Sequence, residues 1–171
     1  MNELLKHVTA VLTTTPLRWN NLTQTIPDEL IRQAPAQGEW SALECLLHLV
    51  DTERLFQSRL QAFAEGRDLP AFDPDVEGTK LTESTSAKDT AAEFERLRRS
   101  TLEMIKALTP PDLDHRSRHT ELGVVSLREM LNEWAAHDLN HTMQAERAMM
   151  QPFIRDSGPW MQYFTAHIIA T

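Results

Sequence analysis

Cysteine, glycine and long apolar runs are scarce in this 171-residue sequence, and each scarcity excludes a class of protein. The single cysteine, Cys45, rules out a disulfide within the chain, which suits a reducing compartment. Charged or amide side chains interrupt every apolar run before the roughly 18 residues that a membrane span requires, and the first residues lack the pattern of a secretory signal. We therefore expect a soluble, cytoplasmic protein that does not cross a membrane.

The charge balance argues against nucleic acid as a partner. The 25 acidic residues outnumber the 17 basic ones, and the net charge of -8 would repel a phosphate backbone. The densest basic stretch is Arg96-Leu97-Arg98-Arg99, which lies among glutamates on a helical pattern. We interpret this stretch as a solvated helix face.

Apolar residues that recur every three or four positions predict helices almost throughout. Capping boxes at Ser41/Glu44 and Ser126/Glu129 mark the starts of two of them, because a serine and a glutamate three residues later can satisfy each other's free amides. Pro16 should begin a new turn or kink the first helix. The predicted helical regions are 3–25, a short segment at 27–33, 41–65 up to Gly66, 86–108, 126–150 before Pro152, and a short terminal helix after Gly158-Pro159.

Long amphipathic helices can hide their apolar faces only by packing on one another. The sequence therefore predicts an all-α fold, an up-and-down four-helix bundle with a short additional C-terminal helix, in a single domain over residues 1–171. Between the helices we expect a turn at 34–38 and a loop at 67–80, with Pro70, Pro74 and Gly78, that is long enough to cover something. The polar segment 112–125 should be irregular, with His115 and His119 in an exposed loop.

His137 and His141 are the residues that could carry chemistry on the last long helix. Four residues apart, they lie on one helical face with their Cβ atoms about 5–6 Å apart, so two nitrogens can converge on one ion. The same face carries Met130, Trp134 and Gln144, which indicates that it looks into the bundle. Taken alone, the pair fits a structural role as well as a ligand role.

His48 lies in the apolar run Leu46 to Val50 on the second long helix, and taken alone it is best explained as a core histidine with one hydrogen bond. Three neutral imidazoles from two facing helices would, however, suit a divalent ion, Zn or Ni, and would leave a position for water or substrate. A water or a thiol activated there supports hydrolysis or group transfer.

Three stretches resemble the DinB-like family of metal-binding four-helix proteins, which includes relatives of bacterial damage-inducible proteins and thiol transferases. They are Gly38–Ser41, His48–Glu53 and Trp134–Gln144. The resemblance implies that the family's metal ligands fall on His48, His137 and His141. It also implies a small-molecule substrate or a thiol cosubstrate of the bacillithiol or mycothiol type, although many members have no assigned reaction.

Other interpretations stay open beside a metal-dependent transferase or hydrolase. A non-catalytic metal or small-molecule binding protein of a stress response would use the same three histidines. The zinc-protease motif His-Glu-x-x-His is only partly matched, because Asp138 is a shorter carboxylate that can point away from the ion, and no third-ligand motif follows. Helix faces could also pair two chains into a homodimer.

Several neighbours of the three histidines have two interpretations. Asp51, Glu133 and Gln144 lie about one turn from a histidine and could orient an imidazole or a bound water. Asp51 and Glu133 fit the helix surface at least as well, whereas Gln144 shares the histidine face. Phe56, Met130 and Trp134 could line a pocket, but at helical spacing such residues usually form the core.

Overall fold

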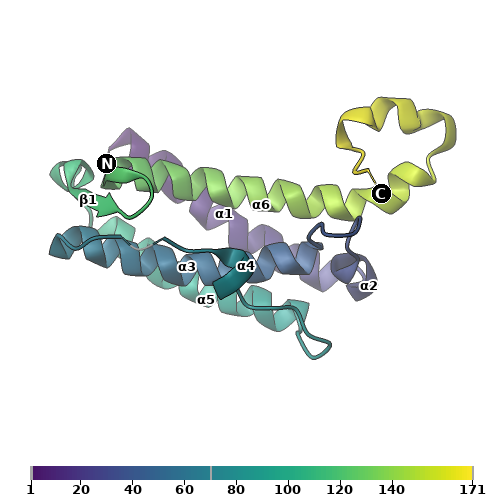
Figure 1. Cartoon of the computed structure of the whole chain (residues 1–171), viewed down its shortest axis with the longest axis horizontal. Coiled ribbons are helices and arrows are strands. Elements are labelled where there is room, and N and C mark those ends of the chain that lie inside the picture. The colour runs from purple at the N-terminus through teal and green to yellow at the C-terminus, as the bar shows by residue number, and fades with distance from the viewer. Residues whose placement is uncertain (1, 70, 171) are drawn as a thin grey trace.

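Four long helices frame the structure, a computed structural model that describes residues 2–69 and 71–170 (Figure 1). They are α1 (Glu3–Thr25), α3 (Ala42–Glu65), α5 (Ala87–Lys106) and α6 (Leu127–Arg155). The shorter elements are α2 (Asp28–Arg32), α4 (Pro74–Glu77), the strands β1 (Arg116–His119) and β2 (Gly123–Ser126), and the 3-10 helices η1 (Pro110–Asp114) and η2 (Gly158–His167). The predicted all-α four-helix bundle with a short C-terminal helix is confirmed. Pro70 lies outside the described residues.

Local capping explains where the helices around the site begin and end. Both predicted capping boxes are present, Ser41 with Glu44 at the start of α3 and Ser126 with Glu129 at the start of α6. Helix α3 ends at Gly66, whose left-handed backbone (φ 65°) is readily adopted by glycine. The positions of the histidines along both helices are therefore fixed by short sequence signals.

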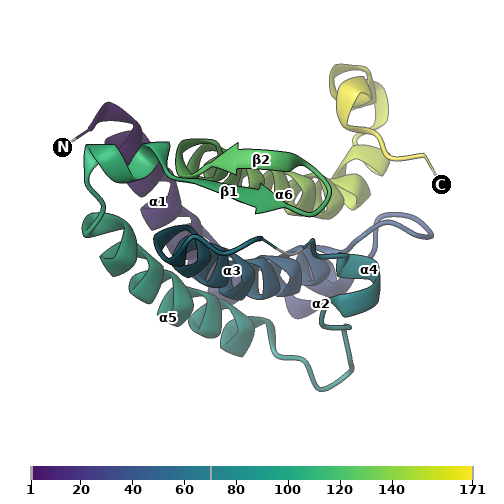
Figure 2. The same ribbon diagram turned by 60° about the vertical axis from the view of Figure 1, so that its left-hand side comes forward.

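The helix directions differ from the simple up-and-down alternation expected from the sequence. Helices α1 and α3 lie diagonally opposite each other in the bundle, and each packs against both α5 and α6. Glu53 and Gln57 of α3 meet Arg98 and Thr101 of α5 in the same order, so α3 and α5 run in the same direction. The chain can do this because residues 66–86, with α4, return along the bundle before α5 begins (Figures 1 and 2).

Two apolar clusters fill the interior. One surrounds Phe56, Leu131 and Trp134 at the end of the bundle near the strands, and the other surrounds Trp19 and Phe94 toward α2. Phe56, Met130 and Trp134 are all buried, as core residues at helical spacing should be. Within the described part of the chain, no helix has both the length and the apolarity to cross a membrane.

The segment predicted to be irregular, 112–125, instead contains η1 and an antiparallel hairpin of β1 and β2. Gly123 has a φ of 76°, which lets the chain turn after a short loop of residues 120–122. Leu69 of the long loop adds to β1 by donating to the carbonyl of Arg118 at 2.7 Å. Figure 2 shows the hairpin lying over α6 and beside α3. The prediction for 112–125 was wrong because four-residue strands are too short to show a clear alternation of apolar and polar residues.

Helix α6 was predicted to end before Pro152. In the structure it continues to Arg155. Proline at this position removes one backbone donor in the last turn and a half of the helix. Ile154, beyond the proline, is buried in the structure. Burial of this side chain offsets the single missing hydrogen bond, so the helix extends past the proline.

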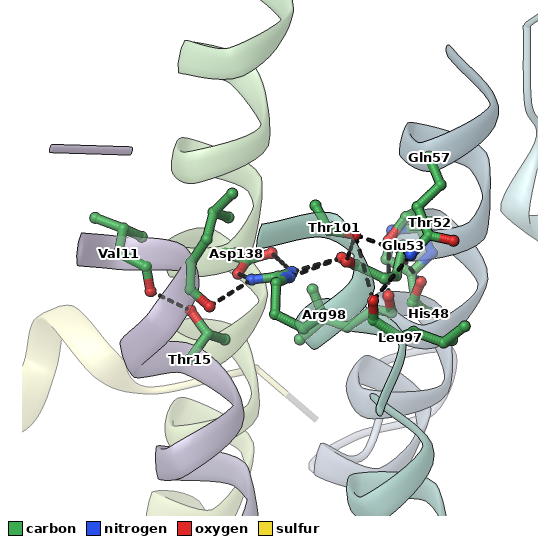
Figure 3. A network of polar contacts seen from close by, with 12 residues as sticks. Val11, Thr15, His48, Thr52, Glu53, Gln57, Leu97, Arg98, Thr101 and Asp138 are labelled. Atoms are coloured by element: carbon green, nitrogen blue, oxygen red, sulfur yellow. Dashed lines mark hydrogen bonds and ion pairs between the residues drawn. The ribbon is translucent and has the colours of Figure 1, made fainter. Parts of the chain in front are cut away.

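The interpretation of residues 96–99 as a solvated face is wrong for Arg98, whose side chain is only 1% exposed. Its guanidinium lies between Glu53 of α3 and Asp138 of α6, with nitrogen to oxygen distances of 2.7 and 2.6 Å (Figure 3). It also donates to the carbonyl of Leu12 at 2.9 Å. Pro16 has no amide hydrogen to offer that carbonyl, so α1 continues through the proline while Arg98 serves as the donor.

Candidate metal centre

The three predicted ligand residues come together at the seam between α3 and α6. His48 projects from α3, and His137 and His141 project from one face of α6. Ligand-type nitrogens of the three side chains lie within 4.8 Å of one another, and the Nε2 atoms of His48 and His137 are 3.0 Å apart. Two nitrogens that each lie 2.0–2.1 Å from one ion would be roughly 2.9–3.4 Å apart. The cluster therefore has the dimensions of a metal site.

The imidazoles are held in the neutral form that binds metal. Burial, followed by the charge of His141, lowers the pKa of His48 to about 4. Burial and the charges of His141 and His48 lower the pKa of His137 to about 3. Burial also lowers the pKa of His141. At neutral pH no proton has to leave these rings before an ion can bind.

The hydrogen bonds of the rings fit a metal better than a purely structural role. Nδ1 of His141 lies 2.9 Å from Oε1 of Gln144, an acceptor, so Nδ1 carries the proton and Nε2 keeps a lone pair. Nδ1 of His137 is buried and has no hydrogen-bond partner among the described residues. Structural histidines would normally have their ring nitrogens satisfied by the protein. Here Nε2 of His48 and Nε2 of His137 lie at hydrogen-bond distance, with a nitrogen of His141 within 4.8 Å, and a cation among them would accept a lone pair from each ring.

Aromatic side chains form the walls of the cluster. The Trp40 ring, just before α3, lies 5.0 Å from the His48 ring and 5.9 Å from the His141 ring between centroids. On the other side, Phe56 meets the edge of His137 at 5.7 Å. Contacts at these distances limit the rotation of the imidazoles.

Asp138 is not available as a general base, although it follows His137 directly. Both of its oxygens accept hydrogen bonds from Arg98, at 2.6 and 3.0 Å, in the core (Figure 3). Burial alone would lower the pKa of Arg98, but the charges and hydrogen bonds of Asp138 and Glu53 raise it. This pairing supports rejection of the protease hypothesis. It also anchors the backbone turn that carries His137.

Of the two other possible orienting residues, Asp51 is held by the long loop and Glu133 lies toward the surface of α6. Asp51 accepts from the backbone amide of Thr79 at 2.6 Å and from its hydroxyl at 2.9 Å, so it ties the long loop to α3. Glu133 lies one turn before His137 on an exposed part of α6. Among the described residues, Gln144 is the one of the three candidates that hydrogen-bonds to a histidine of the cluster.

A small cavity of about 60 Å³ adjoins His48. Its walls come from α3 and from the loop that Asp51 holds: Trp40, Glu44, His48, Asp51 and residues within 74–81. The expectation that the loop at 67–80 covers something agrees with this arrangement. His48 is the histidine of the cluster that lines this cavity.

The two histidines placed in an exposed loop have different surroundings. His115 is exposed, as expected. His119 is 7% exposed on β1, and its Nε2 lies 3.1 Å from Nη2 of Arg59, so the prediction was wrong for this residue. The sequence did hold a signal: the β-branched pair Val124-Val125 follows a glycine, which favours a hairpin. A hairpin would bury one side of the preceding strand, where His119 lies.

Comparisons with known proteins place the chain in a family. A model of the DinB superfamily matches residues 12–145, and the chain belongs to that superfamily. A comparison with curated proteins found no match. The resemblance seen in the three sequence stretches is thereby confirmed.

Solved structures agree on the fold. YfiT from Bacillus subtilis, described as having an unusual four-helix bundle topology, superposes with a TM-score of 0.78 at 14% identity, covering 90% of this chain and 89% of its own. The DinB-like protein YjoA, also from Bacillus subtilis, gives a TM-score of 0.57 at 18% identity, covering 89% and 93%. At these identities the likeness shows the fold alone.

The depressed pKa values predict that metal-free protein loses stability in acid. Unfolded histidine titrates near 6.5, whereas folded His48 and His137 titrate at about 4 and 3. Between these values the unfolded chain binds protons that the folded chain does not, so the free energy of unfolding should fall as the pH drops from about 7 to 4. Thermal melts should show a smaller drop for His48→Gln and His137→Gln, and an unchanged drop for the exposed control His115→Gln. An equal drop in all variants would contradict the assignment.

Removing the amide that holds His141 should weaken metal binding. Ligand histidines depend on the partner of their second nitrogen, and loss of such a partner typically costs about 10- to 100-fold in affinity. We expect this loss for Gln144→Leu in a competition with a zinc chelator. The exposed Gln162→Leu is the matched control. Equal affinity in both variants would show that Gln144 does not support the site.

Proposed function

We propose that the chain is a divalent-metal-dependent enzyme that uses His48, His137 and His141 as ligands and acts on a small molecule. The observation that carries the proposal is the convergence of three neutral imidazoles within 4.8 Å beside a cavity. Zn and Ni suit a site of three nitrogen ligands. A bound ion would supply a Lewis acid that activates a water or a thiol at the position left open by the protein.

The surrounding residues prepare the site for that chemistry. Gln144 fixes the tautomer of His141 through its hydrogen bond. Trp40 and Phe56 pack against the imidazoles and restrict their rotation. Asp51 holds the loop that forms the outer wall of the cavity. A cavity of about 60 Å³ has room for about two water molecules at ~30 Å³ each, so it can admit the reacting end of a substrate.

Two reaction types fit this site. Hydrolysis is supported by YfiT, whose description is a probable metal-dependent hydrolase. Transfer of a low-molecular-weight thiol, of the bacillithiol or mycothiol type, is supported by the resemblance to thiol transferases. In both reactions a bound ion would favour loss of the nucleophile's proton to solvent water, and burial keeps His48, His137 and His141 in the neutral form that would hold the ion.

A second candidate is non-catalytic metal or small-molecule binding, which one observation favours. Of the three acidic residues that line the cavity, the two on α3 are engaged elsewhere: Glu44 accepts from Ser41 in the capping box, and Asp51 accepts from Thr79. The third, Asp75, is exposed on α4. Neither Glu44 nor Asp51 is placed as a general base in the structure. A binding protein has no need of such a base.

An activity screen separates the candidates. Zn- and Ni-loaded protein is assayed with an ester panel and with an electrophilic acceptor plus bacillithiol, mycothiol or glutathione. Turnover that is lost in His137→Ala and retained in the exposed control His115→Ala would support the enzyme, and the productive cosubstrate would identify the reaction type. One bound metal per chain without turnover in either series favours the binding protein. Turnover that survives His137→Ala would contradict the proposed site.

A further inference from the structure

Most of the large apolar side chains that the structure exposes lie between residues 139 and 168. Five of these are more than half exposed: Leu139, Met143 and Phe153 on α6, and Trp160 and Tyr163 in η2. At roughly 100–150 Å² each, the five expose about 500–750 Å² in total. The largest apolar patch of a typical monomer is about 300–600 Å², and larger patches mark interaction sites.

On α6 the exposed apolar side chains belong to one straight stripe. Its members are spaced alternately by four and three residues, as where one helix packs lengthwise on another. They are Leu139, Met143, Glu146, Met150 and Phe153. Leu139 lies two residues from both His137 and His141, and therefore about 160° around the helix from each. The stripe faces away from the candidate metal centre and from α3.

The segment after α6 has a fixed backbone, although its side chains are exposed. Arg147 donates to the carbonyls of His167 and Ile168 at 3.0 and 2.8 Å. The buried Gln151 donates to the carbonyl of His167 at 2.9 Å. No residue of η2 is buried, and the sequence of 157–171 includes no Asp, Glu, Lys or Arg. The bundle thus holds an uncharged, aromatic segment in place without covering it.

The stripe and η2 lie on the same side of the bundle. In both views η2 rises beyond the end of α6, on the side away from α3 and α5 (Figures 1 and 2). The stripe also faces away from α3, and Phe153 lies close to the end of α6 where η2 follows. We call Leu139, Met143, Phe153, Trp160 and Tyr163 together the apolar face.

A groove of about 530 Å³ between α1 and α6 runs beside the stripe and carries no net charge. Small residues of α1, such as Ala10, form one wall, and Leu139 and Met143 belong to the other. The charged residues that line the groove are Arg18 and Glu146, which form an ion pair with each other. Two copies of a chain with net charge -8 repel each other, and a neutral surface is where they can approach.

We propose that the chain forms a two-fold symmetric homodimer through the apolar face. A two-fold interface uses the same patch on both copies, so the patch has to be complementary to itself. Apolar side chains meet this condition, and the ion pair of Arg18 and Glu146 offers both signs of charge beside the middle of the stripe. The area is close to the ~800 Å² that each partner buries in a standard interface, where Met and aromatic residues are enriched. The inference goes beyond the proposed function and needs no metal.

Sedimentation velocity over a range of concentrations tests the proposal. Wild type should sediment as a dimer at micromolar concentration. Met143→Glu and Trp160→Glu should each raise the dissociation constant by about 10- to 100-fold, because each places an unpaired charge in the interface. Val76→Glu is the matched control, since Val76 is 75% exposed on α4, outside the apolar face. His137→Ala should dimerise like wild type, so failure of the metal site would not affect the result.

Cross-linking locates the interface. A two-fold axis near Glu146, the middle of the stripe, would leave Met143 of each copy only about 5 Å from the axis along the helix. A short bis-maleimide should therefore join two chains of Met143→Cys. It should not join two chains of Arg99→Cys, although Arg99 is 74% exposed on α5. The single native cysteine, Cys45, is buried and should not react.

Four results would overturn the proposal. The first is a wild-type protein that stays monomeric at every concentration, as it would if a different partner covered the apolar face. The second is undiminished dimerisation of Met143→Glu or Trp160→Glu, and the third is an equal loss in Val76→Glu. The fourth is a Met143→Cys protein that is not cross-linked at concentrations where it sediments as a dimer.

Discussion

Replacing Arg98 with methionine should lower the free energy of unfolding by about 3–5 kcal/mol, because it leaves two buried carboxylates without their cation. Glu53 and Asp138 are at most 1% exposed, and both are ion-paired to Arg98. This loss is a large part of the about 5–15 kcal/mol that stabilises a typical domain. Urea denaturation followed by circular dichroism measures it.

The neighbouring Arg99 provides a matched control, since its side chain is 74% exposed and pairs with Glu95 on the surface. Arg99→Met should cost less than about 1 kcal/mol. Neutralising all three members together, in Glu53→Gln/Arg98→Met/Asp138→Asn, should cost less than Arg98→Met alone, because no charge is then left unpaired. Similar losses for Arg98→Met and Arg99→Met would show that the buried cluster does not stabilise the fold.

Adding zinc to metal-free protein should raise its melting temperature markedly. A ligand that binds only the folded state stabilises it by about 2.7 kcal/mol when its free concentration is 100 times the dissociation constant. For a chain of this size that corresponds to roughly 5–11 °C. Differential scanning calorimetry in a zinc buffer measures the shift.

The double variant His137→Ala/His141→Ala should show no such shift, because one helix then offers no ligand. His115→Ala should shift like wild type, since His115 is an exposed side chain outside the cluster. A zinc shift of the same size in the double variant would mean that the ion stabilises the protein from another place.

The helices and the histidine pair could be predicted from the sequence because their signals are local. Ser41 with Glu44, and Ser126 with Glu129, mark helix starts within four residues. The spacing of His137 and His141 places them on one face whatever the tertiary structure. The prediction that they lie beside His48 depended on the resemblance to the DinB-like family, because no local sequence pattern shows which helices are neighbours.

Arg98 shows what a local interpretation misses. Its neighbours Arg96 and Arg99 are exposed, so the stretch as a whole looks solvated. At helical spacing, however, Arg98 lies on the same face as the buried Phe94, Thr101 and Ile105. Its partners come from three other segments, and only the assembled bundle supplies enough of them to hold a charge in the core.

The direction of α5 and the hairpin were beyond sequence patterns for a different reason. Simple alternation is the economical arrangement for four helices, and only the packing shows that residues 66–86 return along the bundle instead. The strands are four residues long and pair mainly with each other and with Leu69. A homodimer stays a prediction.

Metal content per chain is the most direct test of the account. Protein purified, stripped and reloaded with zinc or nickel should contain about one tightly bound ion per chain after equilibrium dialysis, as should the control His115→Ala. His48→Ala and His137→Ala should each retain almost none, because two nitrogen ligands hold an ion far more weakly than three. Undiminished stoichiometric metal in both of these variants would contradict a site built from His48, His137 and His141.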